Sequence, residues 1–571
     1  MTRRFLSEIR PYLREVAGRL FIGSIAGIVM NTAVVLPPIL LGRALDAALA
    51  FERGEVSAAA VIWAAIAYAA GTLATEGPRI FKRWFLITAN GRIRARLRED
   101  ALRGVLEWPL ERLDEMPVGD LMARIVADVE VVGVGVRELT VETWDTVLLS
   151  LTLMVALLVK SPGLSLLALA PVPFAMGLAR ISAKWVSRRT TTSRVATGAL
   201  TAAIQEGLAS VRLLRLLGRA DLFVRKIDGL SGDVANANVA TTRLQRGLLP
   251  IYSGLMTIGV IVVVWKGGEQ VVAGSMTVGA FVAFLEIFLR FVGRGPRVPQ
   301  LFNSVQSAAA AFERLRPLLA RRSSGSSAPL AASERPGAVA VGIRNVTFRY
   351  PGSLQPALEE VSLDIPAGAL VAITGAVGSG KSALARALLG LYPLASGEII
   401  LGDVPAAVAY DAGLRGYVGY LSQEPHLFST TVRENVLLGA QHADADEAVA
   451  IAGLEGDVGS FPAALETEVG DLGVRLSGGQ RQRIGLARAL AAPSGGRPRL
   501  LVLDDPFSAL DVDTEARIVA ALRDAFGRSA PPDERATIVL FSHRLAAFPQ
   551  ADDVVMLDRG RVVERGTTTS S

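Results

Sequence analysis

The chain has 571 residues, which is too long for one hydrophobic core and predicts two or more domains. Hydrophobic residues make up 51% and charged residues 20%, and the mean hydropathy of +0.39 is high for a soluble protein, so a membrane portion is expected. The net charge of +6 does not indicate nucleic acid, because the basic residues form no block with interleaved aromatics, and the absence of cysteine excludes disulfides, cysteine-ligated metal and thiol catalysis.

Apolar runs of membrane-spanning length recur in the first half of the chain. Four runs carry no charged residue and have 19 to 22 residues, namely 20–41, 56–75, 161–179 and 247–265. Each can cross about 30 Å of hydrocarbon as a helix. Two weaker segments, 146–159 and 271–291, complete six predicted spans, the last one interrupted by Glu286 and Arg290. Buried helices of a large soluble protein are the disfavoured alternative.

The charges of the intervening segments predict the topology. About 70 residues separate spans two and three, and also spans four and five, and these gaps are charged and helix-forming. Residues 79–112 alone carry nine Lys or Arg against four acids. Because basic loops stay cytoplasmic, we predict that the long gaps, both chain ends and everything after span six lie inside the cell. The basic, amphipathic N-terminus predicts an interfacial helix and no secretory signal.

A change of composition marks the domain boundary. The segment "RRSSGSSAPLAASERPG" (321–337) is rich in Ser, Ala and Pro and has no apolar periodicity, which predicts a flexible linker. We therefore predict a transmembrane domain over 1–320, a linker over 321–338 and a cytoplasmic α/β domain over 339–571, where strand-like and helix-like runs alternate.

The α/β part contains a phosphate-binding motif. The string "LVAITGAVGSGKSALARALLGL" places an apolar strand before a glycine-rich loop and a helical pattern after it. In such a loop, backbone N–H groups close around the phosphates, the lysine reaches the β- and γ-phosphates, and the last hydroxyl binds Mg²⁺. The predicted residues are Gly375, Ala376, Val377, Gly378, Ser379, Gly380, Lys381 and Ser382. Asp504, at the end of the apolar run 500–503, suits a second contact to the metal.

A second predicted anion site lies between these elements. In "LSGGQRQRIGLARAL" (476–490), Ser477, Gly478 and Gly479 begin a basic helix, and a helix N-terminus of this kind can hold an anion. One domain already has its phosphate loop, so this second site would need another purpose. The string alone also allows an ordinary capped surface helix.

Taken together, these motifs resemble the ATPase domain of ABC transporters. The phosphate loop, "LSGGQ" (476–480), the strand ending in Asp504, "SALD" (508–511) and "SHR" (542–544) follow the family's order, and the membrane half resembles the exporter type. The resemblance implies a six-helix transmembrane domain with long cytoplasmic helical extensions, followed by an α/β P-loop ATPase domain. It also implies that two ATPase domains meet head to tail, each ATP lying between one phosphate loop and the other chain's signature, so Ser477, Gly478, Gly479 and Gln480 would serve the partner's nucleotide.

The resemblance assigns four further residues. Tyr350 in "FRYPG" would stack on adenine, and Gln423 in "LSQEPHLF" would contact Mg²⁺ and sense the membrane domain. His543 would hold the γ-phosphate, and Asp511 would communicate across the dimer. The implied cofactors are ATP and Mg²⁺, the metal being held by Ser382, Gln423 and Asp504.

Asp505 departs from the family pattern. Relatives usually carry glutamate after the metal-binding aspartate, where it orients or deprotonates the attacking water. Aspartate is shorter by one methylene, roughly 1 Å, and misplacement by about that distance can cost on the order of 10²-fold in rate. We expect this site to bind ATP and hydrolyse it slowly. Aspartate here resembles the degenerate site of heterodimeric exporters; a homodimer with slow Asp505 chemistry is the alternative.

The predicted function is ATP-driven export of lipophilic or amphipathic compounds, drugs, lipids or peptides across the cell membrane, with a second half-transporter as partner. An importer built on the same fold is the alternative. In span six, the i, i+4 pair Glu286 and Arg290 either contributes to a substrate cavity or only steadies the helix. Further candidate lining residues are Asn31, Trp63, Tyr68, Tyr252, Phe284 and Phe288.

Overall fold

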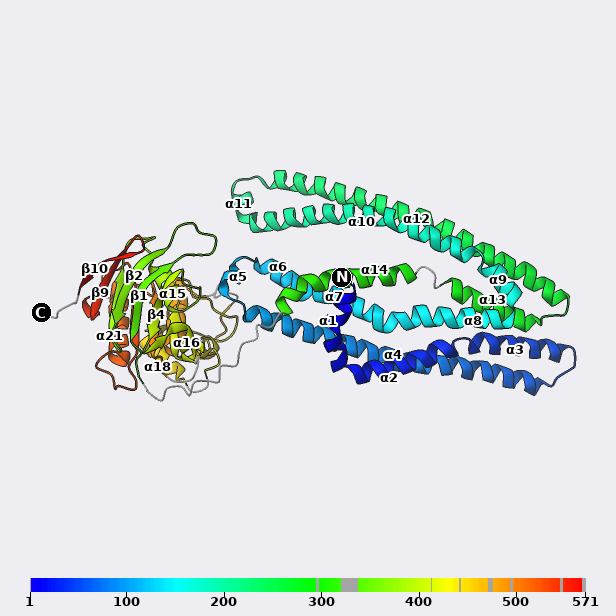
Figure 1. The fold of residues 1–571 in the computed structure, drawn as a ribbon, viewed down its shortest axis with the longest axis horizontal. Helices are drawn as coiled ribbons and strands as arrows, with labels where there is room; N and C mark the ends of the chain where they lie inside the picture. Colours follow the sequence, from blue (N-terminus) through cyan, green and yellow to red (C-terminus); the bar gives the residue numbers. More distant parts are fainter. Residues whose placement is uncertain are drawn as a thin grey trace. The chain divides into compact units, whose positions relative to one another are not determined.

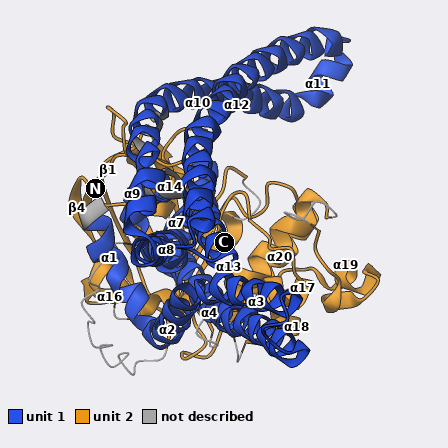
Figure 2. Ribbon diagram, turned by 90° about the vertical axis from the view of Figure 1, so that its right-hand side faces the viewer, with its two compact units in different colours: residues 1–106, 118–320 blue, residues 107–117, 321–571 orange. Residues whose placement is uncertain are grey.

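The computed structural model describes residues 2–293, 297–319, 337–411, 413–440, 443–470, 476–492, 497–544 and 548–566. They belong to two compact units, one formed by residues 1–106 and 118–320 and the other by residues 107–117 and 321–571 (Figure 2). The predicted linker lies outside the described residues as far as 336. The domain bounds given above, 1–320, 321–338 and 339–571, stay predictions.

The first unit is entirely helical over its described residues. Its α-helices are α1 (Thr2–Glu15), α2 (Ala17–Ala33), α3 (Leu36–Glu52), α4 (Ala58–Leu106), α6 (Val118–Met122), α7 (Val129–Arg137), α8 (Leu149–Lys160), α9 (Pro162–Leu169), α10 (Pro171–Ala209), α11 (Val211–Leu216), α12 (Ala220–Val272), α13 (Val278–Val292) and α14 (Arg297–Leu319). Three π-helical segments, η1 (Ala123–Asp128), η2 (Glu138–Glu142) and η3 (Trp144–Leu148), lie between α6 and α8.

Long helices lie side by side in this unit. Helix α2 packs along α4, α3 packs against α4 and α13, and α10 runs beside α12 for most of its length (Figure 1). An apolar core joins α8, α9, α12 and α13 and buries Phe284 and Phe288 almost completely, so these two predicted cavity residues are packing residues in this chain. Large apolar side chains such as Trp63 and Phe174 stay exposed, as expected of lipid-facing helices.

Five helical stretches of the described chain are long and apolar enough to cross a membrane: Ala17–Glu52, Ala58–Leu106, Val118–Lys160, Pro162–Ala209 and Ala220–Val272. They overlap the first five predicted spans, but the count of six is not confirmed. The sixth predicted run, 271–291, straddles a turn in which Gly274 has φ +70° and the Thr277 side chain caps α13. Helix α13 therefore has only 15 residues, about 22 Å at 1.5 Å per residue.

The second unit contains two sheets. An antiparallel sheet has the order β2-β1-β4-β5, with β1 (Val341–Phe348), β2 (Leu358–Ile365), β4 (Ser396–Leu401) and β5 (Val404–Pro405). The larger sheet has the order β10-β9-β3-β8-β7-β6, with β3 (Leu370–Thr374), β6 (Val418–Leu421), β7 (Leu500–Asp504), β8 (Thr537–Phe541), β9 (Asp553–Asp558) and β10 (Arg561–Gly566). All of its pairs are parallel except β9 with β10.

Helices and 3₁₀ turns complete the described part of this unit. They are α5 (Leu110–Asp114), α15 (Lys381–Leu388), α16 (Ala406–Asp411), α17 (Val432–Leu437), α18 (Ala445–Ile451), α19 (Glu455–Ser460), α20 (Gly478–Leu490) and α21 (Val512–Phe526), with 3₁₀ turns η4 (Leu414–Tyr417), η5 (Ala464–Glu466) and η7 (Phe548–Gln550). Every residue of β7 and β8 is buried, because both faces of the parallel sheet are covered. The α/β prediction is therefore correct for this unit.

Candidate nucleotide site

The parallel register brings four predicted segments to one edge of the larger sheet. Strands β3, β8, β7 and β6 pair in that order, and Ile373 and Asp504 both lie opposite Phe541. The residues that follow the carboxyl ends of these strands therefore emerge at the same edge, where ligands bind in open α/β sheets. The phosphate loop follows β3, Gln423 follows β6, Asp505 follows β7 and His543 follows β8.

The phosphate loop between β3 and α15 depends on glycine. Gly375, Gly378 and Gly380 have φ values of +149°, +84° and +106°, which L-side chains rarely adopt. A Cβ at Gly375 would also lie 2.1 Å from the carbonyl oxygen of Leu557. Lys381 folds back over the loop, where its Nζ donates to the carbonyl oxygens of Gly375 (2.7 Å) and Ala376 (2.9 Å). Burial lowers the pKa of Lys381.

Ser382 and Asp504 meet beside this loop. The Ser382 hydroxyl donates to Asp504 Oδ1 at 3.2 Å, although the two residues come from α15 and β7. Asp504 is 4% exposed, and burial raises the pKa of its carboxyl. A hydroxyl and a carboxylate beside a phosphate loop fit Mg²⁺, which takes a few protein oxygens and completes its shell with phosphate and water. Among the described residues, no group of three His, Cys, Asp or Glu forms a self-sufficient metal site.

Asp505 and His543 also come together. Asp505 is 8% exposed and adopts φ +53°, a left-handed conformation that aspartate tolerates better than most side chains. Its backbone N–H donates to the Phe541 carbonyl at 2.8 Å, and its carbonyl accepts from Gln482 Nε2 at 2.6 Å. His543 Nδ1 lies 3.2 Å from Asp505 Oδ1, within ion-pair distance when the imidazole is protonated. The geometry thus joins the two predicted residues, whose catalytic roles stay predictions.

Tyr350 belongs to an aromatic cluster. Its ring packs edge-on against Phe348 (centroids 4.9 Å apart) and Tyr392 (5.9 Å), and its hydroxyl accepts from Arg386 Nη1 at 3.0 Å. The Tyr392 hydroxyl donates to Asp114 of α5, and burial raises the pKa of Tyr392 to about 12. The cluster therefore links the predicted adenine-stacking residue to the segment 107–117. No local sequence motif marks Tyr392, Arg386 or Asp114 as members of this cluster.

The signature forms a capped helix within the chain itself. Ser477 caps α20 in a capping box: its hydroxyl accepts from the Gln480 backbone N–H (3.1 Å), and the Gln480 side chain accepts from the Ser477 N–H (2.9 Å). Gln480 Nε2 also donates to Asp457 at 2.9 Å. Within this chain the signature therefore forms a capped helix N-terminus. Binding of a partner's nucleotide at this N-terminus stays a proposal.

Asp511 likewise caps a helix. It accepts from the Thr514 N–H at 2.8 Å at the start of α21, and this hydrogen bond holds the pKa of Asp511 below its usual range. Gln423 is exposed and follows the carboxyl end of β6. The structure thus places all the predicted nucleotide residues in one unit.

A network that the sequence did not reveal connects the signature helix to the strand ends. Ser508 Oγ donates to Gln482 Oε1 at 3.1 Å, and Gln482 in turn holds the Asp505 carbonyl. Arg544 donates to the carbonyls of Leu510 (2.6 Å) and Ser508 (3.2 Å) and lies 3.4 Å from the fully buried Glu515. These contacts tie α20, α21 and the segment after β8 to the position of Asp505.

We expect Arg544→Met to lower the free energy of unfolding of this unit by about 3 kcal/mol, because it leaves Glu515 buried without its cation. Burial already raises the pKa of Glu515, and Arg544 opposes that rise. Without Arg544 the folded unit would bind more protons than the unfolded chain above pH ~4.3, so stability should fall as pH rises through the folded pKa. The destabilisation should therefore be larger at pH 8 than at pH 5.

Unfolding of the full chain in detergent, followed at both pH values, measures this effect. Arg517→Met is the matched control, since exposed Arg517 lies on the same helix as Glu515 and donates to the Thr514 hydroxyl. Equal losses in the two variants, or a loss independent of pH, would contradict the role given to Glu515.

The helical region followed by an ATPase fold with these motifs defines an ABC transporter. Residues 20–294 match the family model "ABC transporter transmembrane region", and residues 358–508 match the model "ABC transporter". The chain belongs to the ABC transporter family, as a multi-pass membrane protein fused to an ATP-binding domain whose ATPase activity is coupled to transport.

Its relatives cover nearly the whole chain. It is 30% identical over 547 residues to the probable multidrug resistance ABC transporter ATP-binding/permease protein YheI of Bacillus subtilis, covering 94% of this chain and 90% of the relative. It is 28% identical over 573 residues to the multidrug resistance-like ATP-binding protein MdlA of Escherichia coli (99% and 93% covered). It is also 28% identical over 573 residues to the ATP-dependent lipid A-core flippase of Thiobacillus denitrificans (99% and 94%).

Proposed function

We propose that the chain is one half of an ATP-driven exporter of amphipathic compounds, and that it pairs with a second half-transporter of different sequence. The names of its relatives, which refer to multidrug resistance and to lipid flipping, support the exporter direction and the amphipathic substrate class. The proposed setting is the cell membrane, with the N-terminus, the long helical extensions and the ATPase domain on the cytoplasmic side.

The observation that carries the heterodimer proposal is Asp505. Its carboxylate occupies the position of the usual glutamate, is one methylene shorter, and belongs to a residue only 8% exposed, with its backbone held on both sides by Phe541 and Gln482. Because its backbone is held on both sides, residue 505 cannot shift toward the attacking water to recover the roughly 1 Å of reach that the shorter side chain lacks. The composite site on this chain's phosphate loop would then hydrolyse ATP slowly.

The other composite site would be competent. The intact signature of this chain, presented by the capped start of α20, would complete the nucleotide site on the partner's phosphate loop. In each site a bound Mg²⁺ would polarise the terminal phosphate. On this chain Ser382, Asp504 and Gln423 would hold it, Tyr350 would stack on adenine, His543 would hold the γ-phosphate and Asp511 would signal across the dimer. Closure of the two ATPase domains would switch the side to which the membrane cavity opens.

Purified chain alone should therefore hydrolyse ATP at a rate on the order of 10²-fold below that of its mixture with the partner encoded by a neighbouring gene. Steady-state phosphate release, with Asp505→Asn measured in parallel, tests this. Asp505→Asn should change the turnover of the mixture little, since the competent site lies on the partner's phosphate loop. Robust hydrolysis by the chain alone that disappears in Asp505→Asn would establish a homodimer instead.

A further inference from the structure

Three polar side chains from three candidate spans meet inside the first unit. They are Asn31 of α2, Lys82 of α4 and Asp145 of η3. Asp145 Oδ1 pairs with the Lys82 ammonium and accepts from Asn31 Nδ2 at 3.2 Å, and Asn31 Nδ2 also donates to the Gly27 carbonyl at 2.8 Å. Asn31 is one of the cavity residues predicted from the sequence, and no local motif connects it with the other two.

The cluster leaves acceptor oxygens without donors. Lys82 is 1% exposed and Asn31 is 0% exposed, yet Asn31 Oδ1 has no hydrogen-bond partner among the described residues. Asn31 Nδ2 donates to two acceptors, Gly27 O and Asp145 Oδ1. Rotating the amide by 180° would place its oxygen against both acceptors, so the orientation is fixed. Asp145 is 21% exposed, and both of its bonds use Oδ1, so its Oδ2 has no hydrogen bond from the described chain. A hydrogen-bond donor or a cation beside Asp145 would pair with these acceptor oxygens.

Such a cluster is costly unless it has a use. Lys82 is 1% exposed, and taking an ammonium group out of water carries a desolvation cost that its partner must offset. A buried ion pair is often no more stabilising than apolar packing of the same volume. The backbone around Asp145 is π-helical, an arrangement frequent at functional sites. Packing alone therefore does not explain this pair.

The surroundings of Asp145 favour a cation. The neighbouring indole of Trp144 lies against α2, since a Cβ at Gly27 would lie 3.6 Å from its ring, and a further carboxylate, Glu142, lies one turn earlier. An aromatic face next to a carboxylate is a favourable environment for a desolvated cation.

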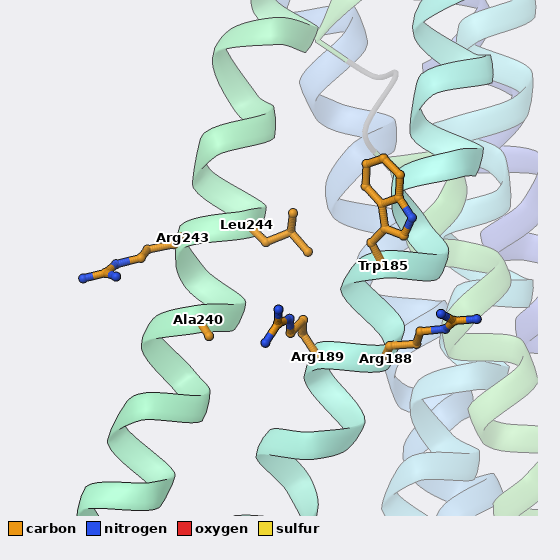
Figure 3. A pocket seen from close by; sticks show the side chains of 6 residues that line it. All are labelled: Trp185, Arg188, Arg189, Ala240, Arg243 and Leu244. Atoms are coloured by element: carbon orange, nitrogen blue, oxygen red, sulfur yellow. The ribbon is translucent and has the colours of Figure 1, made fainter.

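A cavity elsewhere in the unit has the opposite charge. It lies between α10 and α12, has a volume of about 440 Å³, and is lined by Trp185, Arg188, Arg189, Ala240, Arg243 and Leu244, with Arg189 between the two helices (Figure 3). Its three arginines and no acid would repel a cation, so this cavity does not compete with Asp145 for one.

We propose that Asp145, oriented by Lys82 and Asn31, receives the charged centre of a lipophilic cation, which makes amphipathic cations the substrate class of this transporter. The proposal rests on the proposed export function and adds the sign of the substrate's charge. Lys82 occupies Oδ1 and leaves Oδ2 for the ligand. It also competes with the ligand for the same carboxylate, so its removal should strengthen cation binding.

Two probes of nearly equal shape and opposite charge test the sign. Tetraphenylphosphonium and tetraphenylborate are titrated by equilibrium dialysis against the full-length chain in lipid nanodiscs, with empty nanodiscs as the measure of partition into lipid. We expect saturable binding of tetraphenylphosphonium and none of tetraphenylborate above the lipid background. Equal binding of both ions, or no saturable binding of the cation, overturns the proposal.

Variants then locate the site. Asp145→Asn should weaken tetraphenylphosphonium binding at least about tenfold, because this ion has no hydrogen-bond donor and would lose the Coulomb attraction of the carboxylate, and Lys82→Met should strengthen it. Asp46→Asn is the matched control: Asp46 is another carboxylate of a candidate span, but its two oxygens accept from Thr277 Oγ1 and from the Gly279 N–H, each at 2.7 Å, so this change should leave the affinity unchanged.

A purely structural ion pair predicts another pattern, in which Asp145→Asn and Lys82→Met weaken binding together; that pattern overturns the proposal. If Asp145→Asn does not fold, the comparison of the two ions and the Lys82→Met affinity still decide it. Basal ATP turnover with the partner is measured on every variant. Turnover that persists without cation binding refutes the substrate class alone, whereas absent turnover in the unaltered complex refutes the transporter function.

Discussion

Gly478→Asp in this chain should lower the ATP turnover of the heterodimer about 10²–10³-fold, the usual cost of losing one preorganised electrostatic contact to the reacting group. Gly478 is the first residue of α20, and in the proposed dimer it would face the γ-phosphate held by the partner's phosphate loop. A carboxylate there repels that phosphate. It does not harm the helix, because an acid in the first turn is favourable, and a Cβ at this position would lie 3.7 Å from the Ala509 Cβ, an ordinary contact.

The matched comparison is Lys381→Ala in the same chain. Lys381 lies in this chain's own phosphate loop, which the proposal assigns to the slow site, so turnover should fall less than about tenfold. Gly478→Ala, which adds the methyl without the charge, separates steric from electrostatic loss. Steady-state phosphate release from the co-purified complex measures all three. Equal loss in Lys381→Ala and Gly478→Asp would mean that the two sites are equivalent and that the asymmetry is wrong.

Asp505→Glu should raise hydrolysis at this chain's own site on the order of 10²-fold, because the added methylene restores roughly 1 Å of reach toward the attacking water. The backbone opposes part of the gain: Asp505 has φ +53°, and glutamate adopts this region less readily, at a cost on the order of 1 kcal/mol. The gain should therefore appear in the rate together with a slightly lower unfolding temperature.

This variant is measured in the complex whose partner site has been inactivated, so that only the site on this chain's phosphate loop contributes. Asp505→Asn, which keeps the length and removes the charge, is the control and should show no gain. A rate for Asp505→Glu equal to that of the unaltered chain would show that the reach of residue 505 is not what limits this site.

Several features could be predicted from the sequence because their causes are local. The glycines of the phosphate loop are required by backbone angles that only glycine adopts freely, and the loop was predicted from them. The apolar run before Asp504 predicted a strand, and β7 is fully buried. Five uncharged or nearly uncharged runs predicted helices that are long and apolar enough for a membrane.

The sixth span shows the limit of this reasoning. Composition treats residues 271–291 as one apolar run, whereas the turn at Gly274 and the Thr277 cap divide it. Hydropathy averages over a window and is insensitive to a short turn whose residues are uncharged.

Only the tertiary structure decided which distant side chains meet. Ser382 contacts Asp504 because β3 and β7 flank β8 in register, and Asn31, Lys82 and Asp145 meet because α2, α4 and η3 pack together. Local sequence determines backbone angles and the face that each element buries. The contact of residues more than 100 positions apart depends on how those faces pack, and no segment read by itself contains that information.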